Sequence, residues 1–183
     1  YKGGNKLPMV ILLSSEGSEE YGGTIPLGLE LEKGDPPPTQ ESDVDKEIPK
    51  GNFDSRNTYA IIIGNENYIY QPTATFARQD AVVFKKYCTN LLGINQKNVP
   101  DLTYDLYSSA MKLDNTTDLA TWIENFGKAA NEHPNQKNLI FLYSGHGELD
   151  ADKNVLLVPT EASSSNYAHL SLKLSDLCEK ISQ

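Results

Sequence analysis

Two uninterrupted runs of apolar residues predict buried strands in this chain. One run, Tyr59–Ile63, ends at Gly64 and is followed by a polar loop at 65–68. The other, Leu139–Tyr143, is followed by Ser-Gly-His-Gly at 144–147. Runs of about five apolar residues are long enough for a buried strand and too short for a helix. The glycines that follow favour a turn, so each strand is expected to end where its loop begins.

Apolar residues at helical spacing predict three helices. They cover 76–92, with Gly93 as a stop signal, a segment that follows Asn115-Thr-Thr-Asp, and 172–181. Shorter or alternating apolar runs predict further strands at 7–13, 27–32, 102–107 and 155–159. Alternating strands and helices are typical of an α/β domain with a parallel sheet and right-handed crossovers. In such a sheet, ligands and catalytic groups gather past the carboxyl ends of the strands.

The organisation along the 183 residues is uneven. Residues 1–33 contain two predicted strands that could form a β-hairpin. Residues 34–56 combine Pro36-Pro37-Pro38 with Glu41, Asp43, Asp45 and Glu47, a composition that favours an extended linker. We therefore predict an N-terminal hairpin-like segment (1–33), an acidic proline-rich linker (34–56) and a main domain (57–183).

Composition limits the classes of function and partner that are expected. A formal net charge of −9 argues against nucleic acid as a partner and is compatible with a basic substrate. The two cysteines, Cys88 and Cys178, do not make a disulfide framework. No apolar stretch is long enough to cross a membrane, so no membrane span is expected. The compartment is not predicted.

The segment Tyr143–Gly147 resembles the histidine motif of the caspase and metacaspase cysteine peptidases, in which a buried strand ends in Ser-Gly-His-Gly. Gln79-Asp80-Ala81 is similar to the Asn-Asp-Ala sequence that begins the first helix of metacaspases, although Gln79 departs from the asparagine. Leu156–Pro159 looks like the short strand that ends in proline after the histidine loop. The resemblance covers about residues 57–183, and related clostripain-like peptidases share it.

This resemblance implies a caspase-like three-layer sandwich, with a mostly parallel central sheet and helices on both faces. It implies that His146 is the catalytic base and that the Gly147 N–H helps to stabilise the oxyanion. It also implies that Asp80 and Ser144 line the pocket for the P1 residue of a protein or peptide substrate, with a preference for Arg or Lys. A plainer explanation exists for two of these residues. His146 could be an ordinary turn residue, and Asp80 could interact with the helix dipole.

The nucleophile is missing from this pattern. A cysteine peptidase needs a thiolate near the histidine, and in caspases the cysteine follows the histidine by about 50 residues. Cys178 follows His146 by only 32 residues and sits in an amphipathic helical pattern, and Cys88 lies in the middle of a predicted helix. Both are therefore expected to be packing residues. A second chain or a C-terminal segment would have to carry the catalytic cysteine.

Two other classes of function remain open. A non-catalytic caspase-like scaffold would also explain the missing cysteine. A nucleotide-binding domain is the weakest alternative, because neither Gly-x-Gly-x-x-Gly nor Gly-x-x-x-x-Gly-Lys occurs. Asp150, Asp152, Asn154 and Glu161 partly match a calcium loop, but Val155 stands where that loop needs glycine. A solvated acidic loop is the better interpretation, so no metal or cofactor is expected.

Overall fold

The computed structural model describes residues 9–14, 46–51, 53, 55, 57–100, 104–113, 118–132 and 138–182. The predicted strand at 27–32 and most of the predicted linker at 34–56 lie outside these residues. The division into a hairpin-like segment, a linker and a main domain therefore stays a prediction.

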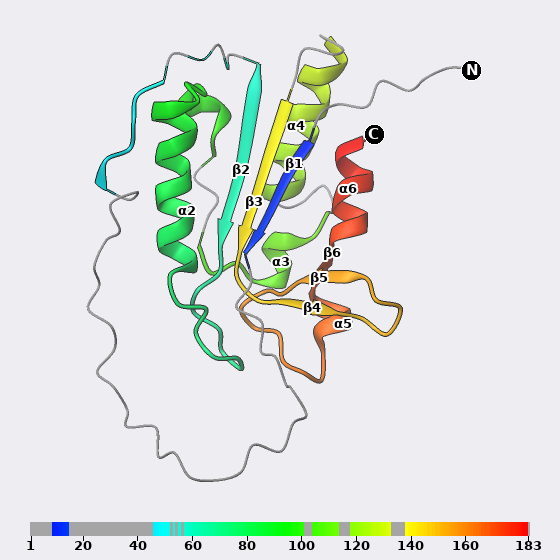
Figure 1. The fold of residues 1–183 in the computed structure, drawn as a ribbon. Coiled ribbons are helices and arrows are strands. Elements are labelled where there is room, and N and C mark those ends of the chain that lie inside the picture. The colour runs from blue at the N-terminus through cyan, green and yellow to red at the C-terminus, as the bar shows by residue number, and fades with distance from the viewer. Residues whose placement is uncertain are drawn as a thin grey trace.

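A parallel sheet of three strands forms the centre of the described structure. Its strands are β1 (Met9–Ser14), β2 (Thr58–Gly64) and β3 (Asn138–Ser144), in the order β1-β3-β2. β3 is parallel to both neighbours, and all three strands run in the same direction (Figure 1). The prediction that the two buried apolar runs share a sheet is confirmed. β1 belongs to this sheet as well, although its sequence lies in the predicted N-terminal segment.

The described helices include the three predicted segments and, in addition, short helices that the sequence pattern does not predict. They are α2 (Ala77–Lys86), its π-helical extension η1 (Tyr87–Leu91), the 3-10 turn η2 (Gln96–Asn98), α3 (Ser108–Met111), α4 (Asp118–Glu132), α5 (Tyr167–Leu170) and α6 (Leu174–Ser182). Gly93 has φ +66°, a left-handed conformation that suits glycine and ends the first of the predicted helices. Parallel strands joined through helices make this an α/β fold.

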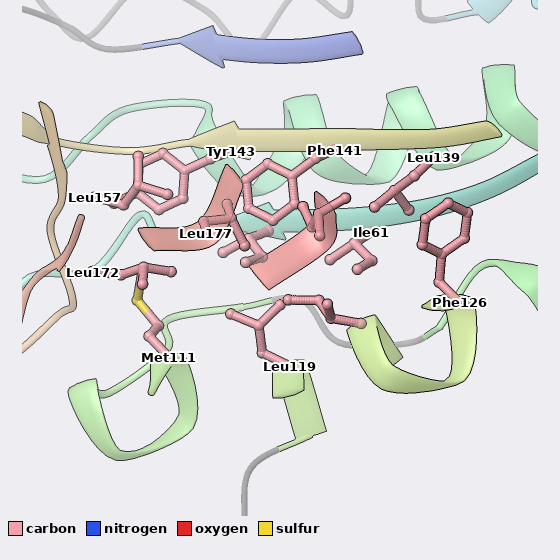
Figure 2. Packing of buried hydrophobic residues seen from close by; sticks show 13 residues of the cluster. Ile61, Met111, Leu119, Phe126, Leu139, Phe141, Tyr143, Leu157, Leu172 and Leu177 are labelled. Carbon is pink, nitrogen blue, oxygen red and sulfur yellow. The ribbon is translucent and has the colours of Figure 1, made fainter. Parts of the chain in front are cut away.

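Helices pack against both faces of the parallel sheet because successive strand residues point to opposite faces. Ile61, Ile63 and Phe141 belong to a core cluster that also contains residues of α3, α4 and α6, and we call it the α4-side cluster. Figure 2 shows its side chains packed below β3. Ala60 and Ile62 face a second cluster that includes residues of α2 and η1. Each fully buried leucine or phenylalanine in such clusters contributes about 1.5–3 kcal/mol.

A second, smaller sheet is antiparallel and lies beside the carboxyl end of the first (Figure 1). It contains β4 (Gly147–Leu149), β5 (Val155–Leu157) and β6 (Leu172–Lys173), in the order β4-β5-β6. The predicted strand at 155–159 is thus found, but it pairs outside the parallel sheet. The helix expected from Leu172 begins two residues later, because Leu172 and Lys173 pair with β5.

The predicted strand at 102–107 is wrong for its described part, residues 104–107. Only an isolated parallel bridge joins Tyr104 to Gly64. The next residue, Asp105, has φ +55°, which no extended strand can adopt. The chain turns there and passes over the end of β2.

Among the described helices, none has the length and apolar character needed to span a membrane.

Candidate functional site

The candidate site lies at the carboxyl edge of the parallel sheet, where β2 and β3 end side by side. Gly64 and Ser144 are register partners, so the loops that follow them start next to each other. The backbone N–H of Asn65 donates a hydrogen bond of 2.8 Å to the Ser144 carbonyl. His146 follows β3 by two residues and precedes β4. The expected place of His146, just past the end of a buried strand, is confirmed.

Asn65 connects three segments at this edge, and its side chain is fully buried. Its Nδ2 donates to the Val158 carbonyl at 3.3 Å, and its Oδ1 accepts the Leu106 N–H at 2.9 Å. A buried amide must be satisfied in this way, because an unpaired polar group in the core is costly. The sequence pattern places Asn65 only in a loop. Its one available signal was its position directly after a buried strand.

Two tyrosine hydroxyls lie under the His146 turn. The Tyr68 Oη accepts the His146 backbone N–H at 2.8 Å and lies 3.1 Å from the Tyr143 Oη. The Tyr143 Oη is 2.7 Å from the Val158 carbonyl, its shortest contact. The Tyr143 Oη also lies 3.0 Å from the His146 carbonyl oxygen, and the Tyr68 Oη lies 3.2 Å from the Val158 carbonyl oxygen. Each hydroxyl has one proton and a carbonyl within reach, so either phenol can donate to the other. Burial raises the pKa of both phenols, that of Tyr143 most strongly, so both stay neutral donors at physiological pH.

Gly145 makes this close approach possible. A Cβ built at Gly145 would lie 2.6 Å from the Tyr68 Oη and 3.0 Å from the Tyr143 Oη. Its φ of +155° is also a conformation that residues with a side chain rarely adopt. Glycine is therefore required between Ser144 and His146 for a steric reason.

The imidazole of His146 is half-buried and held from two sides by the loop after β2. Its Nε2 lies 2.8 Å from the Pro72 carbonyl oxygen. A carbonyl can only accept, so Nε2 must carry the proton, and the lone pair of the neutral ring is then on Nδ1. The Tyr68 ring packs against the imidazole, with centroids 4.4 Å apart and planes tilted by 54°.

Asp80 and Ser144 meet at the same edge. The buried Ser144 Oγ donates a hydrogen bond of 3.0 Å to Oδ2 of Asp80, which lies in the first turn of α2. Asp80 itself is exposed. The start of α2 can approach β2 closely because Gly64 has no side chain, and a Cβ there would lie 2.5 Å from the Ala77 carbonyl oxygen. The structure thus brings Asp80 of α2 to Ser144, which lies two residues before His146, and so joins two segments that the sequence patterns single out separately.

The backbone N–H of Gly147 points away from β5. The Val158 N–H donates to the His146 carbonyl at 3.1 Å, and Gly147 faces Leu157 in the antiparallel ladder. In such a ladder, hydrogen-bonded and non-hydrogen-bonded pairs alternate. Gly147 and Leu157 form a non-hydrogen-bonded pair, which directs the Gly147 amide outward beside His146.

Asp105 organises the loop that carries Tyr68 and Pro72. Its Oδ1 accepts the backbone N–H groups of Glu66 at 2.8 Å and Asn67 at 2.9 Å. Its Oδ2 accepts the Asn67 side-chain amide at 2.8 Å. Partial burial acts to raise the pKa of Asp105, but these hydrogen bonds outweigh it and hold the pKa below its usual range. No pattern in the sequence pointed to this role.

Neither cysteine lies at the carboxyl edge. Cys88 is fully buried in η1, and burial raises its pKa to about 12. Cys178 lies in α6, and burial also raises the pKa of its thiol. A thiol with a raised pKa is a poor nucleophile, because the thiolate is the reactive form. The prediction that Cys88 is a packing residue is confirmed.

The acidic loop after β4 is internally compensated. Oδ1 of Asp150 accepts the backbone N–H groups of Asp152 and Asn154, and Lys173 Nζ lies 2.9 Å from Oδ2. Glu161 instead directs Oε1 to the N–H of Ser108 at 2.7 Å, so it does not join Asp150. Across the described parts of the chain, no group of three or more histidine, cysteine or carboxylate side chains could hold a metal ion.

In comparisons with known proteins, no protein-family model matches the chain, and no curated protein matches it significantly.

Proposed function

We propose that this chain provides the histidine and part of the P1 pocket of a caspase- or metacaspase-like cysteine endopeptidase that cleaves after Arg or Lys. In this proposal the α/β fold is the three-layer sandwich of that family. The substrate is a protein or peptide, and a second chain or a C-terminal segment carries the cysteine. The observation that carries the proposal is the meeting of a tautomer-fixed histidine and an exposed carboxylate at one edge of the sheet.

His146 has the role of general base. The Pro72 carbonyl orients the ring as a third group orients the base in catalytic triads, and it leaves the Nδ1 lone pair for the thiol proton. After attack by the thiolate, the same nitrogen would protonate the leaving amine. A base that is already oriented loses less entropy when the transition state forms.

Gly147 has the role of oxyanion donor. Attack on the scissile carbonyl creates a negatively charged oxygen, which a backbone N–H aimed at it stabilises. The outward amide of Gly147 lies one residue after His146, which supports this role. A tetrahedral oxyanion needs a second donor, and the backbone N–H of the nucleophilic cysteine would supply it.

Asp80 and Ser144 have the role of P1 recognition. Asp80 is exposed, so its charge is open to a cationic side chain from the substrate. Ser144 keeps one carboxylate oxygen in place by a hydrogen bond. Arginine can bind a carboxylate through two parallel hydrogen bonds, and lysine through its ammonium group. A P1 aspartate would be disfavoured because its carboxylate and that of Asp80 repel each other.

The strand order limits where the cysteine can come from. Both edges of β3 are paired, one with β1 and the other with β2, and these strands end at Ser14 and Gly64. In this proposal the thiol comes either from above the carboxyl edge or from a strand that takes the place of β1. This same observation favours the alternative function, a non-catalytic caspase-like scaffold in which β1 permanently fills that position.

Hydrolysis of matched peptides by the complete protein separates the two functions. The peptides differ only in a P1 Arg, Lys or Asp. If the protein is a peptidase, it should cleave after Arg and Lys. His146→Ala should then lower this activity roughly a hundredfold or more. His169→Ala, an exposed histidine on α5, is the matched control and should stay within about twofold. A wild-type protein that cleaves none of the peptides would favour the scaffold, and faster cleavage after Asp would overturn the proposed specificity.

A further inference from the structure

The loop after β2 holds His146 at two points. Through the Pro72 carbonyl it contacts the imidazole, and through Tyr68 it contacts the backbone, where the Tyr68 Oη accepts the His146 N–H at 2.8 Å. Tyr68 and His146 are 78 residues apart in the sequence. The pairing therefore exists only because β2 and β3 end side by side.

The Tyr68 side chain is held in place by neighbouring groups, so it can hold the His146 turn in place. Its hydroxyl lies 3.1 Å from the Tyr143 Oη, which is bound to the Val158 carbonyl in the floor of the site. Gly145 leaves just enough space for the hydroxyl, because any side chain there would collide with it. The phenol ring is also in contact with the imidazole, at a centroid distance of 4.4 Å. One side chain thus touches both the backbone and the ring of His146.

We infer that Tyr68 is a positioning residue for His146: its hydroxyl anchors the backbone of the turn, and this anchor keeps the imidazole facing Pro72 with Nδ1 available. The inference rests on the proposed function for its catalytic consequence. Its structural content, the orientation and tautomer of His146, does not depend on any peptidase activity.

The neighbouring tyrosine provides a matched comparison. Tyr70 lies two residues further along the same loop and is exposed over 67% of its surface. Both residues lose the same single oxygen atom when changed to phenylalanine. Of these two residues, Tyr68 has the hydroxyl that binds the turn carrying His146, so Tyr68→Phe and not Tyr70→Phe should affect the imidazole.

The test measures Tyr68→Phe and Tyr70→Phe in the complete protein by two independent methods. The first is ¹⁵N NMR of the His146 imidazole, which distinguishes the two neutral tautomers. We expect the wild type and Tyr70→Phe to have the proton on Nε2, and Tyr68→Phe to show a mixture of both tautomers. The second is steady-state kinetics with a P1 Arg peptide. We expect kcat to fall about tenfold in Tyr68→Phe with KM within twofold, because one hydrogen bond to the catalytic turn is lost.

Each outcome decides the inference. An unchanged tautomer in Tyr68→Phe would overturn the positioning of His146. An unchanged kcat, or an effect on KM alone, would overturn its catalytic consequence. Loss of cooperative unfolding would also overturn the inference, because the hydroxyl would then be needed for the fold. If the wild type cleaves no peptide, the proposed function fails. The NMR comparison still decides whether Tyr68 positions His146.

Discussion

Two aspartates that the sequence patterns single out, Asp80 and Asp150, have different surroundings in the folded chain. Asp80, at the start of α2, is exposed and accepts a hydrogen bond from Ser144. Asp150 is surrounded by donors. Hydrogen bonds from the Asn154 side chain and backbone, followed by the one from Lys173, hold its pKa well below its usual range. One carboxylate is open to a cationic ligand, whereas the charge of the other is compensated within its own sheet. Acidic composition alone therefore does not identify a binding site; the donors around each carboxylate do.

Asp105 lies near the candidate site, as Asp80 does, but its carboxylate is bound by several donors, as that of Asp150 is. Its donors come from residues 38 and 39 positions away in the sequence, in the loop after β2, whereas Asp150 finds backbone donors within four residues. Asp105 thus supports the candidate site without being open to a ligand. Asp105 therefore organises the loop after β2 and Asp150 the turn after β4, whereas substrate binding by Asp80 is part of the proposed function.

The largest expected effect comes from disturbing the turn that follows Ser144, the hydrogen-bond partner of Asp80. Gly145→Ala would place a Cβ 2.6 Å from the Tyr68 Oη, so the turn or the tyrosine must move. We expect a destabilisation of about 2–3 kcal/mol, measured by urea unfolding. Gly127→Ala in α4 is the control, because a Cβ there meets nothing within 4 Å. It should stabilise the protein by about 0.5–1 kcal/mol. Equal effects at both glycines would contradict the steric argument.

The next effect concerns binding rather than folding. Asp80→Asn removes a charge that a P1 Arg or Lys would pair with, so kcat/KM for these substrates should fall about tenfold or more. The unfolding free energy should stay within about 0.5 kcal/mol, because Asp80 is exposed. Asp152→Asn, at an exposed position of the acidic loop, should change neither quantity. If both variants lower kcat/KM equally, the overall charge and not a pocket carboxylate attracts the substrate.

The third variant should lower stability and leave substrate preference unchanged, the opposite of Asp80→Asn. Asp105→Asn weakens the carboxylate bonds to Glu66 and Asn67, so we expect about 1–2 kcal/mol of destabilisation. The ratio of kcat/KM for Arg over Asp peptides should remain that of the wild type. Chemical unfolding and the peptide series measure these two quantities. A changed ratio with unchanged stability would mean that Asp105 contacts the substrate.

The smallest expected effect depends on pH. Because the pKa of Asp150 is lowered by folding, its contribution to stability is present above the unfolded value of about 3.9 and is lost as pH falls through the folded value. The difference in urea midpoint between wild type and Asp150→Asn should therefore shrink from pH 5 towards pH 2. A difference that grows on acidification would reverse the sign and refute the assignment.

Local sequence patterns predicted the main strands, the longer helices and the turn that carries His146. Apolar runs located β2 and β3, helical spacing located α2, α4 and α6, and the glycines around His146 located the turn that carries it. Each of these features is decided by residues a few positions apart, through side-chain periodicity and backbone sterics. The histidine and the aspartate of the candidate site could be named for the same reason, since each lies at a recognisable boundary of an element.

Only the tertiary structure decided how these elements support one another. The pairing of β1 with β3, the separation of β5 into an antiparallel sheet and the left-handed Asp105 depend on contacts that no local pattern encodes. Asn65 contacts Leu106 across 41 positions, and Tyr68 contacts His146 across 78. An asparagine or tyrosine in a polar loop has many possible partners, and sequence spacing favours none of them. The partners are selected when burial of the two core clusters aligns β2 with β3, because a polar group enclosed at that edge must then be hydrogen-bonded.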